Sequence, residues 1–336
     1  MDLKGKDFVD HLKLDLIYPL EYEGLFDGIG RAGELPRILA NKNSFVGDKI
    51  HSCGESLRDV DVEDLVERGL VEKRDIGEIV VKESFALKGS LRGHGVAVRG
   101  PVGFEKDVVI GRSTIIGPAY VSEGSKIFDS LLRGGPGGSV YIGRNCSLWD
   151  YTVIIRSLIG DSSLIHTCNL DDSIIGPDSN FGATRAMSSF RRSGKNRPRP
   201  GHQTLLGQRI VLANYSYGNK IRIFDPVTEN VVQVEATHFG TLSGTGVWLA
   251  SGTMVYPGTI IGSGAKVNST IPLIGYVPPD QTYSLFVSVK KDRHERKAIQ
   301  LKGTLAQQMQ EHSARSIVNM RESENKKVAR REKASD

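Results

Sequence analysis

The chain has 336 residues, of which 39% are hydrophobic and 25% charged, so it can bury at least one full core and is not disordered by composition. No apolar run approaches the roughly 18 residues of a membrane span, and charges interrupt the N-terminal segment where a signal peptide would be apolar. The formal net charge of +5 is modest, so nucleic acid is not an expected partner. We therefore expect a cytoplasmic globular protein.

The cysteines exclude two further classes of protein. Cys53, Cys146 and Cys168 are scattered and form no CxxC pair. This spacing argues against a disulfide framework and against a thiolate zinc site. We expect reduced thiols with mostly structural roles.

Residues 1–80 are expected to form a small N-terminal α/β region. They contain none of the repeats that follow. The stretch DVDVEDLVERGLVEKRD predicts a short amphipathic helix, because its apolar residues recur among acids and bases. The pattern does not indicate what this region binds.

A six-residue repeat predicts the fold of residues 81–184 and 239–283. Aliphatic residues recur at this period in two series, Leu249, Val255, Ile261 and Val267, and Ile142, Leu148 and Ile154. The period fits neither a helix nor a simple strand. It fits a prism of very short strands, in which each hexad gives one inward side chain and glycine permits a tight corner. We therefore predict an all-β fold of stacked coils, each stabilised by its neighbours.

Residues 185–238 interrupt the repeat as a basic loop and a β-hairpin. RAMSSFRRSGKNRPR carries six basic residues and no acid, and Arg191, Arg192 and Arg197 are candidates to bind cofactor or substrate phosphates. Guanidinium groups make forked bonds to phosphate oxygens, although a solvated loop would have the same composition. In NKIRIFDPVTENVVQVEA, alternating aliphatic residues flank a turn and predict the hairpin. Residues 284–336 are expected to form a charged helical tail.

The repeats resemble the coils of the hexapeptide-repeat acyltransferases. The stretches that carry the resemblance are GPAYVSEGSKI, LIHTCNLDDSIIGPDSNFGA and HFGTLSGTGVWLASGTMVYPGTIIGSGAKV. They are most similar to the C-terminal acetyltransferase domain of the bifunctional glucosamine-1-phosphate acetyltransferase/N-acetylglucosamine-1-phosphate uridylyltransferases, especially the archaeal sugar-1-phosphate nucleotidylyltransferase type. The resemblance covers about half of the chain and implies a left-handed parallel β-helix. The repeats begin near residue 81 with no G-x-G-T-R loop before them, so we expect no nucleotidyltransferase domain and no pyrophosphorylase activity.

For the chemistry, the resemblance implies acyl transfer from a CoA thioester, with acetyl-CoA as donor and no metal at the site. The acceptor would be an amine or hydroxyl of a sugar phosphate or nucleotide sugar. His166 falls on the family's catalytic histidine, and a neutral imidazole can remove a proton from the acceptor. Ala250, Ser251 and Ser269 fall where the family contacts the pantetheine arm of CoA between subunits, although small residues at corners often serve packing alone. A homotrimer or a dimer of trimers is therefore expected.

The acceptor pocket departs from the family pattern. Asn169 stands where the family has a sugar-contacting tyrosine, and Ser189 stands where it has an asparagine. An amide can still donate and accept hydrogen bonds, so Asn169 and Ser189 stay candidate catalytic-site residues for a different acceptor. Other polar residues that could build this site, or could be solvated corners, are Asp150, Arg156, Asp171 and Asp172.

Two alternatives remain open at this level. A non-catalytic trimeric scaffold or sugar-nucleotide-sensing subunit would show the same repeats, with His166 as a structural side chain packed between coils. A gamma-class carbonic anhydrase shares the prism but needs closely spaced zinc-binding histidines. That class is disfavoured, because His94, His166, His202 and His238 are widely separated.

Overall fold

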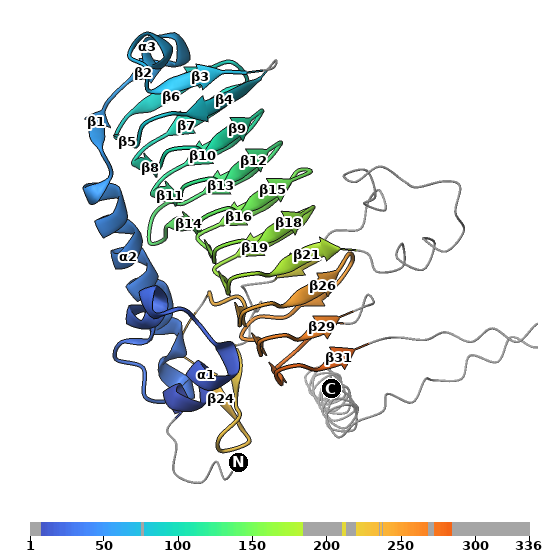
Figure 1. Ribbon diagram of the computed structural model, residues 1–336. Helices are drawn as coiled ribbons and strands as arrows, with labels where there is room; N and C mark the ends of the chain where they lie inside the picture. Colours follow the sequence, from blue (N-terminus) through green and yellow to red (C-terminus); the bar gives the residue numbers. More distant parts are fainter. Residues whose placement is uncertain are drawn as a thin grey trace, which may run out of the picture. The chain divides into compact units, whose positions relative to one another are not determined.

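The protein forms a left-handed parallel β-helix, as the hexads and the resemblance predict (Figure 1). The computed structural model describes residues 8–74, 77–183, 210–212, 220–234, 236, 238–267 and 272–283. Within these residues, three sheets of 10, 9 and 10 strands form the faces of the prism, and a separate two-stranded sheet accompanies them. The tail predicted for residues 284–336 lies outside the described residues.

The strands of the three faces are short. Sheet A contains β1 (Glu55–Leu57), β5 (Phe85–Leu87), β8 (Val102–Phe104), β11 (Ala119–Val121), β14 (Val140–Ile142), β17 (Leu158–Ile159), β20 (Ile174–Ile175), β25 (Leu242–Ser243), β28 (Ile260–Ile261) and β30 (Tyr276–Val277). Sheet B contains β2 (Val60–Asp61), β6 (Ser90–Gly93), β7 (Val96–Arg99), β10 (Thr114–Ile116), β13 (Leu131–Arg133), β16 (Val153–Ile155), β19 (Cys168–Asp171), β22 (Ile210–Leu212) and β27 (Met254–Val255). Sheet C contains β3 (Val71–Lys73), β4 (Glu78–Val81), β9 (Val109–Gly111), β12 (Lys126–Phe128), β15 (Ser147–Trp149), β18 (Leu164–His166), β21 (Asn180–Ala183), β26 (Trp248–Ala250), β29 (Lys266–Val267) and β31 (Thr282–Tyr283).

The interior of the prism is a column of aliphatic side chains. The two series that define the hexads are buried without exception: Leu249, Val255, Ile261 and Val267, and Ile142, Leu148 and Ile154. Most corners turn through residues with positive φ, a conformation that aspartate and asparagine tolerate better than other side chains. Asp129, Asp150 and Thr167 occupy successive corners between sheets C and B in this conformation. The repeat thus sets both the core and the outward positions.

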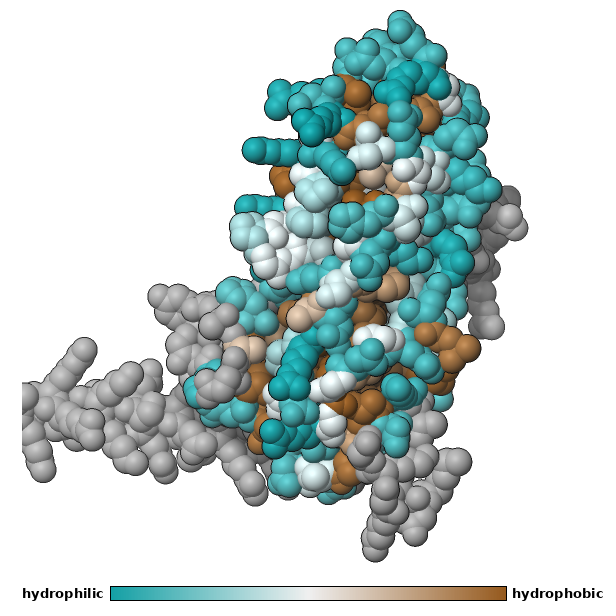
Figure 2. All heavy atoms as spheres, turned by 90° about the vertical axis from the view of Figure 1, so that its left-hand side faces the viewer, coloured by the Kyte–Doolittle hydropathy of each residue, from teal (hydrophilic) through white to brown (hydrophobic). Residues whose placement is uncertain are grey.

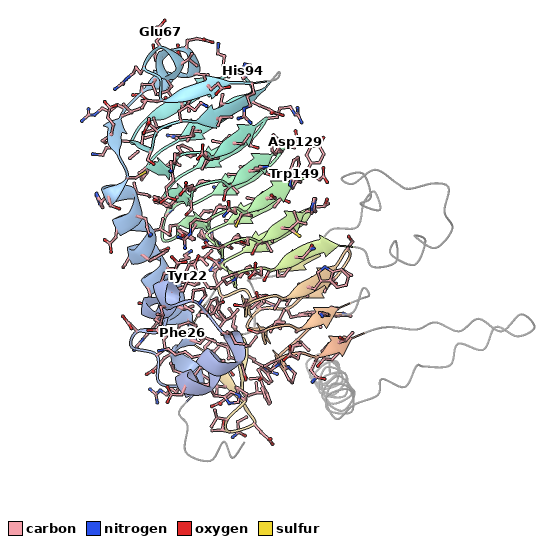
Figure 3. All side chains as sticks on the ribbon, viewed as in Figure 1. Tyr22, Phe26, Glu67, His94, Asp129 and Trp149 are labelled. Carbon is pink, nitrogen blue, oxygen red and sulfur yellow. The ribbon has the colours of Figure 1, made fainter. Side chains whose placement is uncertain are left out.

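The N-terminal helices cover the outer face of sheet A (Figure 1). These elements are α1 (Phe8–Leu16), η1 (Leu20–Phe26), η2 (Ala32–Arg37) and α2 (Ile38–Ser52). Tyr120 and Tyr141 point outward from sheet A and share a buried cluster with Tyr22 and Phe26 of η1. Figure 3 shows Tyr22 and Phe26 on this side of the prism, and Figure 2 shows that the outer surface here is largely hydrophilic. The outer face of sheet A is therefore buried in a second hydrophobic core and is not an exposed apolar surface.

The N-terminal segment also reaches the last coils. The carbonyl oxygen of Leu16 accepts a hydrogen bond from the amide of Thr245 (2.9 Å), and that of Asp15 accepts one from Ser263 (2.7 Å). The hydroxyl of Tyr276 donates to the carboxylate of Asp15. The segment thus ties the C-terminal coils to the helical layer.

Two local predictions are confirmed. The short helix is α3 (Val62–Glu67), and the side chains of Asp61 and Asp64 form a capping box at its start. The hairpin is β23 (Ile221–Asp225) paired antiparallel with β24 (Asn230–Val234). No helix among the described residues is long and apolar enough to cross a membrane.

Candidate functional site

His166 lies at the end of β18, on the outer face of sheet C. Its neighbour Ile165 points into the prism and is fully buried, so strand alternation turns His166 outward. The parallel register pairs His166 with Trp149 of β15 on the preceding coil. The His166 side chain is 22% exposed and is therefore accessible from the surface.

The corner between β15 and β16 brings a carboxylate to this histidine. Two consecutive residues in this corner have positive φ, Asp150 (57°) and Tyr151 (61°), whereas the corner after β18 has Thr167 alone (47°). The Oδ2 atom of Asp150 lies 3.5 Å from Nδ1 of His166. This separation is longer than an ordinary hydrogen bond but close enough for the carboxylate to orient the imidazole ring.

The surroundings of His166 favour the neutral imidazole. Burial lowers the pKa of His166, and the Asp150 carboxylate opposes part of this shift. The neutral ring is the form that can accept a proton. Because Nδ1 faces Asp150, the arrangement favours the tautomer with its hydrogen on Nδ1 and the basic lone pair on Nε2. The pair therefore has the geometry of a general base that is oriented by a carboxylate.

On the following coil, glycine stands next to His166. A Cβ atom on Gly182 would lie 2.4 Å from the His166 carbonyl oxygen and 2.9 Å from the His166 Cβ, so only glycine fits. One coil further, β26 ends at Ala250, which is buried. Since adjacent strands lie about 4.8 Å apart, a strip about 10 Å long beyond His166 carries no large side chain at Gly182 or Ala250.

The other described members of the predicted site have different surroundings. Ser251 is buried, and its hydroxyl donates a hydrogen bond to the carbonyl oxygen of Gly182 (2.8 Å). This bond gives Ser251 a structural contact, and its contact with CoA stays a prediction. Asn169 belongs to β19 in sheet B and so extends from the neighbouring face of the prism, beyond the same corner as His166.

Several predicted site residues lie outside the described residues: Ser189, Ser269, Arg191, Arg192 and Arg197. Their place in the chain is still informative for four of them. β21 of sheet C ends at Ala183 and β22 of sheet B begins at Ile210, so the basic stretch falls between these two strands in the sequence.

A second polar cluster lies at the corner between sheets B and A. Arg156 donates two hydrogen bonds to Asp172 (2.8 and 2.7 Å) and one to Asp171 (3.0 Å). Burial and the neighbouring Asp172 raise the pKa of Asp171 to about 6. His238 is near enough to act on Asp171 electrostatically. Arg156 and Asp171 thus lie at the corner between sheets B and A, whereas His166 lies at the corner between sheets C and B.

A cavity of about 470 Å³ lies between α2 and the corners at Pro101 and Pro118. His51 and Lys88 line it, whereas the predicted site residues that the structure describes do not. Within the described part of the chain, no group of three or more His, Cys, Asp or Glu side chains could hold a metal ion. The His166 corner therefore lies outside this cavity, and the His166 side chain is reached from the surface.

These observations define a class of protein: a hexapeptide-type β-helix that carries a histidine and an aspartate at an outer corner. A search of family models finds no match to the chain. The chain is 29% identical over 191 residues to the "Bifunctional protein GlmU" of Koribacter versatilis (strain Ellin345), in an alignment that covers 50% of this chain and 36% of that protein. The chain thus spans about a third of the length of this relative. The similarity agrees with the resemblance of the repeats to those of the hexapeptide-repeat acyltransferases.

A search of solved structures matches two acetyltransferases at low similarity. The polysialic-acid-specific acetyltransferase NeuO has 15% identity and a TM-score of 0.23, with 58% of this chain and 76% of that chain covered. The polysialic acid O-acetyltransferase OatWY has 9% identity and a TM-score of 0.16, with 72% and 88% covered.

Proposed function

We propose that the protein is a CoA-dependent acyltransferase that transfers an acetyl group to an amine or hydroxyl of a sugar, as a sugar phosphate or nucleotide sugar. The observation that supports this most is the half-buried, neutral His166 held against Asp150, with Gly182 beside it on the next coil. The similarity to a bifunctional GlmU agrees with this chemistry.

The reaction needs a base, because a protonated amine cannot attack a thioester. In the proposed reaction Nε2 of His166 takes a proton as the acceptor attacks the thioester carbon. A bond from nitrogen or oxygen to carbon forms, and the bond from carbon to sulfur breaks. The proton then passes from His166 to the departing CoA thiolate. Asp150 stabilises the imidazolium that exists between the two transfers.

The donor and the acceptor are proposed to meet at His166. The pantetheine arm would run past Gly182 and Ala250, which carry no large side chain of their own. In the proposed trimer a neighbouring subunit closes the strip beyond His166. The basic stretch with Arg191, Arg192 and Arg197 would contact phosphates of the cofactor or the acceptor.

The test combines calorimetry with a histidine variant. Acetyl-CoA is titrated into the protein, and amino and hydroxyl sugars, their 1-phosphates and nucleotide sugars are then screened for acetylation. For the best acceptor, His166→Ala should lower kcat by about a hundred- to ten-thousand-fold and leave acetyl-CoA affinity and assembly unchanged. His51→Ala is the control, because His51 lies on α2 beside the other cavity.

Two results would favour the non-catalytic scaffold instead. One is an absence of acetyl-CoA binding and of acetyl transfer to every sugar tested. The other is a His166→Ala protein that loses thermal stability and activity in parallel, as expected for a histidine that only packs between coils.

A further inference from the structure

Trp149 forms a preorganised aromatic surface next to His166. Its indole stacks on the ring of Phe128 on the preceding coil, with ring centroids 4.5 Å apart and planes inclined by 18°. Phe128 in turn packs over Gly111, where a Cβ would come within 2.5 Å of the Phe128 ring. Since Phe128 is buried and Trp149 is only half-buried, the stack fixes the indole and leaves part of it at the surface.

The second face of the indole lies toward the coil that carries His166. Trp149 and His166 are register partners, so their side chains leave sheet C about 5 Å apart. Within the described residues, no ring stacks on this second face. The exposed part of the indole is thus held beside the proposed base, and a ligand would reach it from the solvent side, since the two adjacent strands are only about 5 Å apart.

The polar groups around this surface are mainly acidic. Asp150 contacts His166, and Arg112 is bound by Asp129 through two hydrogen bonds (2.8 and 2.9 Å). The hydroxyl-bearing side chain of Tyr151 is 70% exposed at the same corner and is near enough to act on Arg112 electrostatically. Figure 3 shows Trp149 and Asp129 at the same edge of the prism. Among the described residues, the side chains of Arg112, Asp129 and Asp150 together carry a net charge of −1 (one positive, two negative).

We propose that Trp149 is the subsite for the pyranose ring of an amino-sugar acceptor. The apolar C–H face of the ring would pack on the indole and remove apolar surface from water. The hydroxyl groups of the sugar would donate to Asp150, and its amine would face Nε2 of His166. This proposal rests on the function proposed above, since it takes His166 as the base.

The charge of the corner favours an amino sugar over other flat ligands. A protonated amine is attracted by the uncompensated Asp150 before it loses its proton. A phosphate group would meet Asp129 and Asp150, with Arg112 already bound to Asp129. A phosphate on the acceptor would therefore have to extend away from Trp149.

The experiment uses the full chain, which contains 2 tryptophans. In the Trp248→Phe variant, Trp149 is the single fluorescent tryptophan. Glucosamine, without acetyl-CoA, should change its emission saturably, and glucose should do so more weakly. By calorimetry, Trp149→Leu should weaken glucosamine binding by about tenfold, and Trp149→Phe by less.

Trp248→Leu is the matched control, because Trp248 also points outward from sheet C but on a later strand, β26. It should leave glucosamine affinity within about twofold. The proposal is overturned if Trp149→Leu binds glucosamine as the wild type does, or if no sugar perturbs Trp149. If Trp149→Leu dissociates the assembly, Trp149→Phe is used instead, and glucosamine affinity equal to that of the wild type in the intact assembly then overturns the proposal.

The outcomes separate this proposal from the proposed function. Glucosamine binding at Trp149 without acetyl transfer would contradict the proposed acyltransferase function and support the sugar subsite at Trp149. If the protein transfers acetyl groups and Trp149→Leu leaves the KM for the sugar unchanged, the acyltransferase function is supported and the sugar subsite at Trp149 is contradicted.

Discussion

Asp150 and His166 are sixteen residues apart in the chain, yet Oδ2 of Asp150 lies 3.5 Å from Nδ1 of His166. The contact arises because one turn of the β-helix separates the two corners. Burial and the carboxylate act in opposite directions on the pKa of His166, and burial has the larger effect. The pair can therefore be tested by its effect on the pH dependence of the reaction.

Asp150→Asn should move the acid limb of the pH–rate profile to lower pH. The carboxylate raises the pKa of His166, so its removal leaves burial unopposed and the imidazole is protonated only in more acidic solution. The maximal rate should also fall, but by less than the about hundred- to ten-thousand-fold expected for loss of the base. Asp178→Asn is the control, since Asp178 has a similar φ of 54° at another corner. An unchanged limb in Asp150→Asn would show that the carboxylate does not act on the base.

Gly182→Ala should disturb both stability and catalysis. The residue has a φ of 96°, and the added Cβ would meet the backbone of His166 at 2.4 Å. Gly28→Ala is the matched control, because Gly28 has a φ of 70° with no atom within 4 Å of the added Cβ. We expect Gly28→Ala to cost about 1 kcal/mol, from the left-handed conformation alone, and Gly182→Ala to cost more. Thermal unfolding and kcat are measured for both. If both variants lose the same stability, the backbone near His166 shifts to accommodate the added Cβ of Gly182→Ala at no further cost.

Lys42→Met should change how stability depends on pH. Lys42 is 1% exposed, and its ammonium group donates to the carbonyl oxygens of Ser139 and Arg156. Burial lowers the pKa of Lys42 to about 7, so above pH 7 the folded protein releases a proton that the unfolded chain keeps up to about pH 10. The free energy of unfolding of the wild type, relative to Lys42→Met, should therefore rise between pH 7 and pH 9. The slope is at most about 1.4 kcal/mol per pH unit.

Urea unfolding at pH 7, 8 and 9 measures this difference. Lys49→Met, on the same helix α2, is the control for loss of a positive charge. A difference between wild type and Lys42→Met that is constant with pH would show that Lys42 is not perturbed in the folded protein.

Val153→Glu should break the expected homotrimer. Sheet A is covered by the chain's own helices, so we expect a subunit interface to use the faces of sheets B and C. Leu131 and Val153 are register partners that point outward from sheet B and are half-buried. A carboxylate there would be desolvated in an interface. Light scattering should show a trimer or a dimer of trimers for the wild type, smaller species for Val153→Glu, and no change for Val231→Glu on the exposed hairpin strand β24. A wild type that is a stable monomer at micromolar concentration would contradict the assembly.

The hexads made the prism predictable, because an inward position that recurs every six residues has few other solutions. The covering of sheet A was not predicted, although the sequence contains a signal for it. Leu158-Ile159, Ile174-Ile175 and Ile260-Ile261 place aliphatic residues at both the inward and the outward position of a strand. Consecutive aliphatic residues in such short strands indicate that both faces of the sheet are buried.

The histidine of the site could be chosen from the sequence, but its neighbours could not. The contacts of Asp150 and Trp149 with the His166 corner depend on the register between coils, and that register depends on the length of every corner. The corner at Asp150 and Tyr151 is longer than the one at Thr167. Spacing within one coil therefore did not predict which side chain of the previous coil meets His166.

The hydrogen bonds between the first helix and the last coils have a consequence for biosynthesis. Asp15 and Tyr276 are 261 residues apart. At translation rates of about 5–20 residues per second, roughly 10 to 50 seconds pass between their appearance. During this time the apolar residues of α1 and η1 lack the coils they will cover, and the growing β-helix leaves part of sheet A open. The nascent chain therefore exposes two complementary apolar surfaces until the coil with Tyr276 has been synthesised, and during this interval a chaperone could bind them.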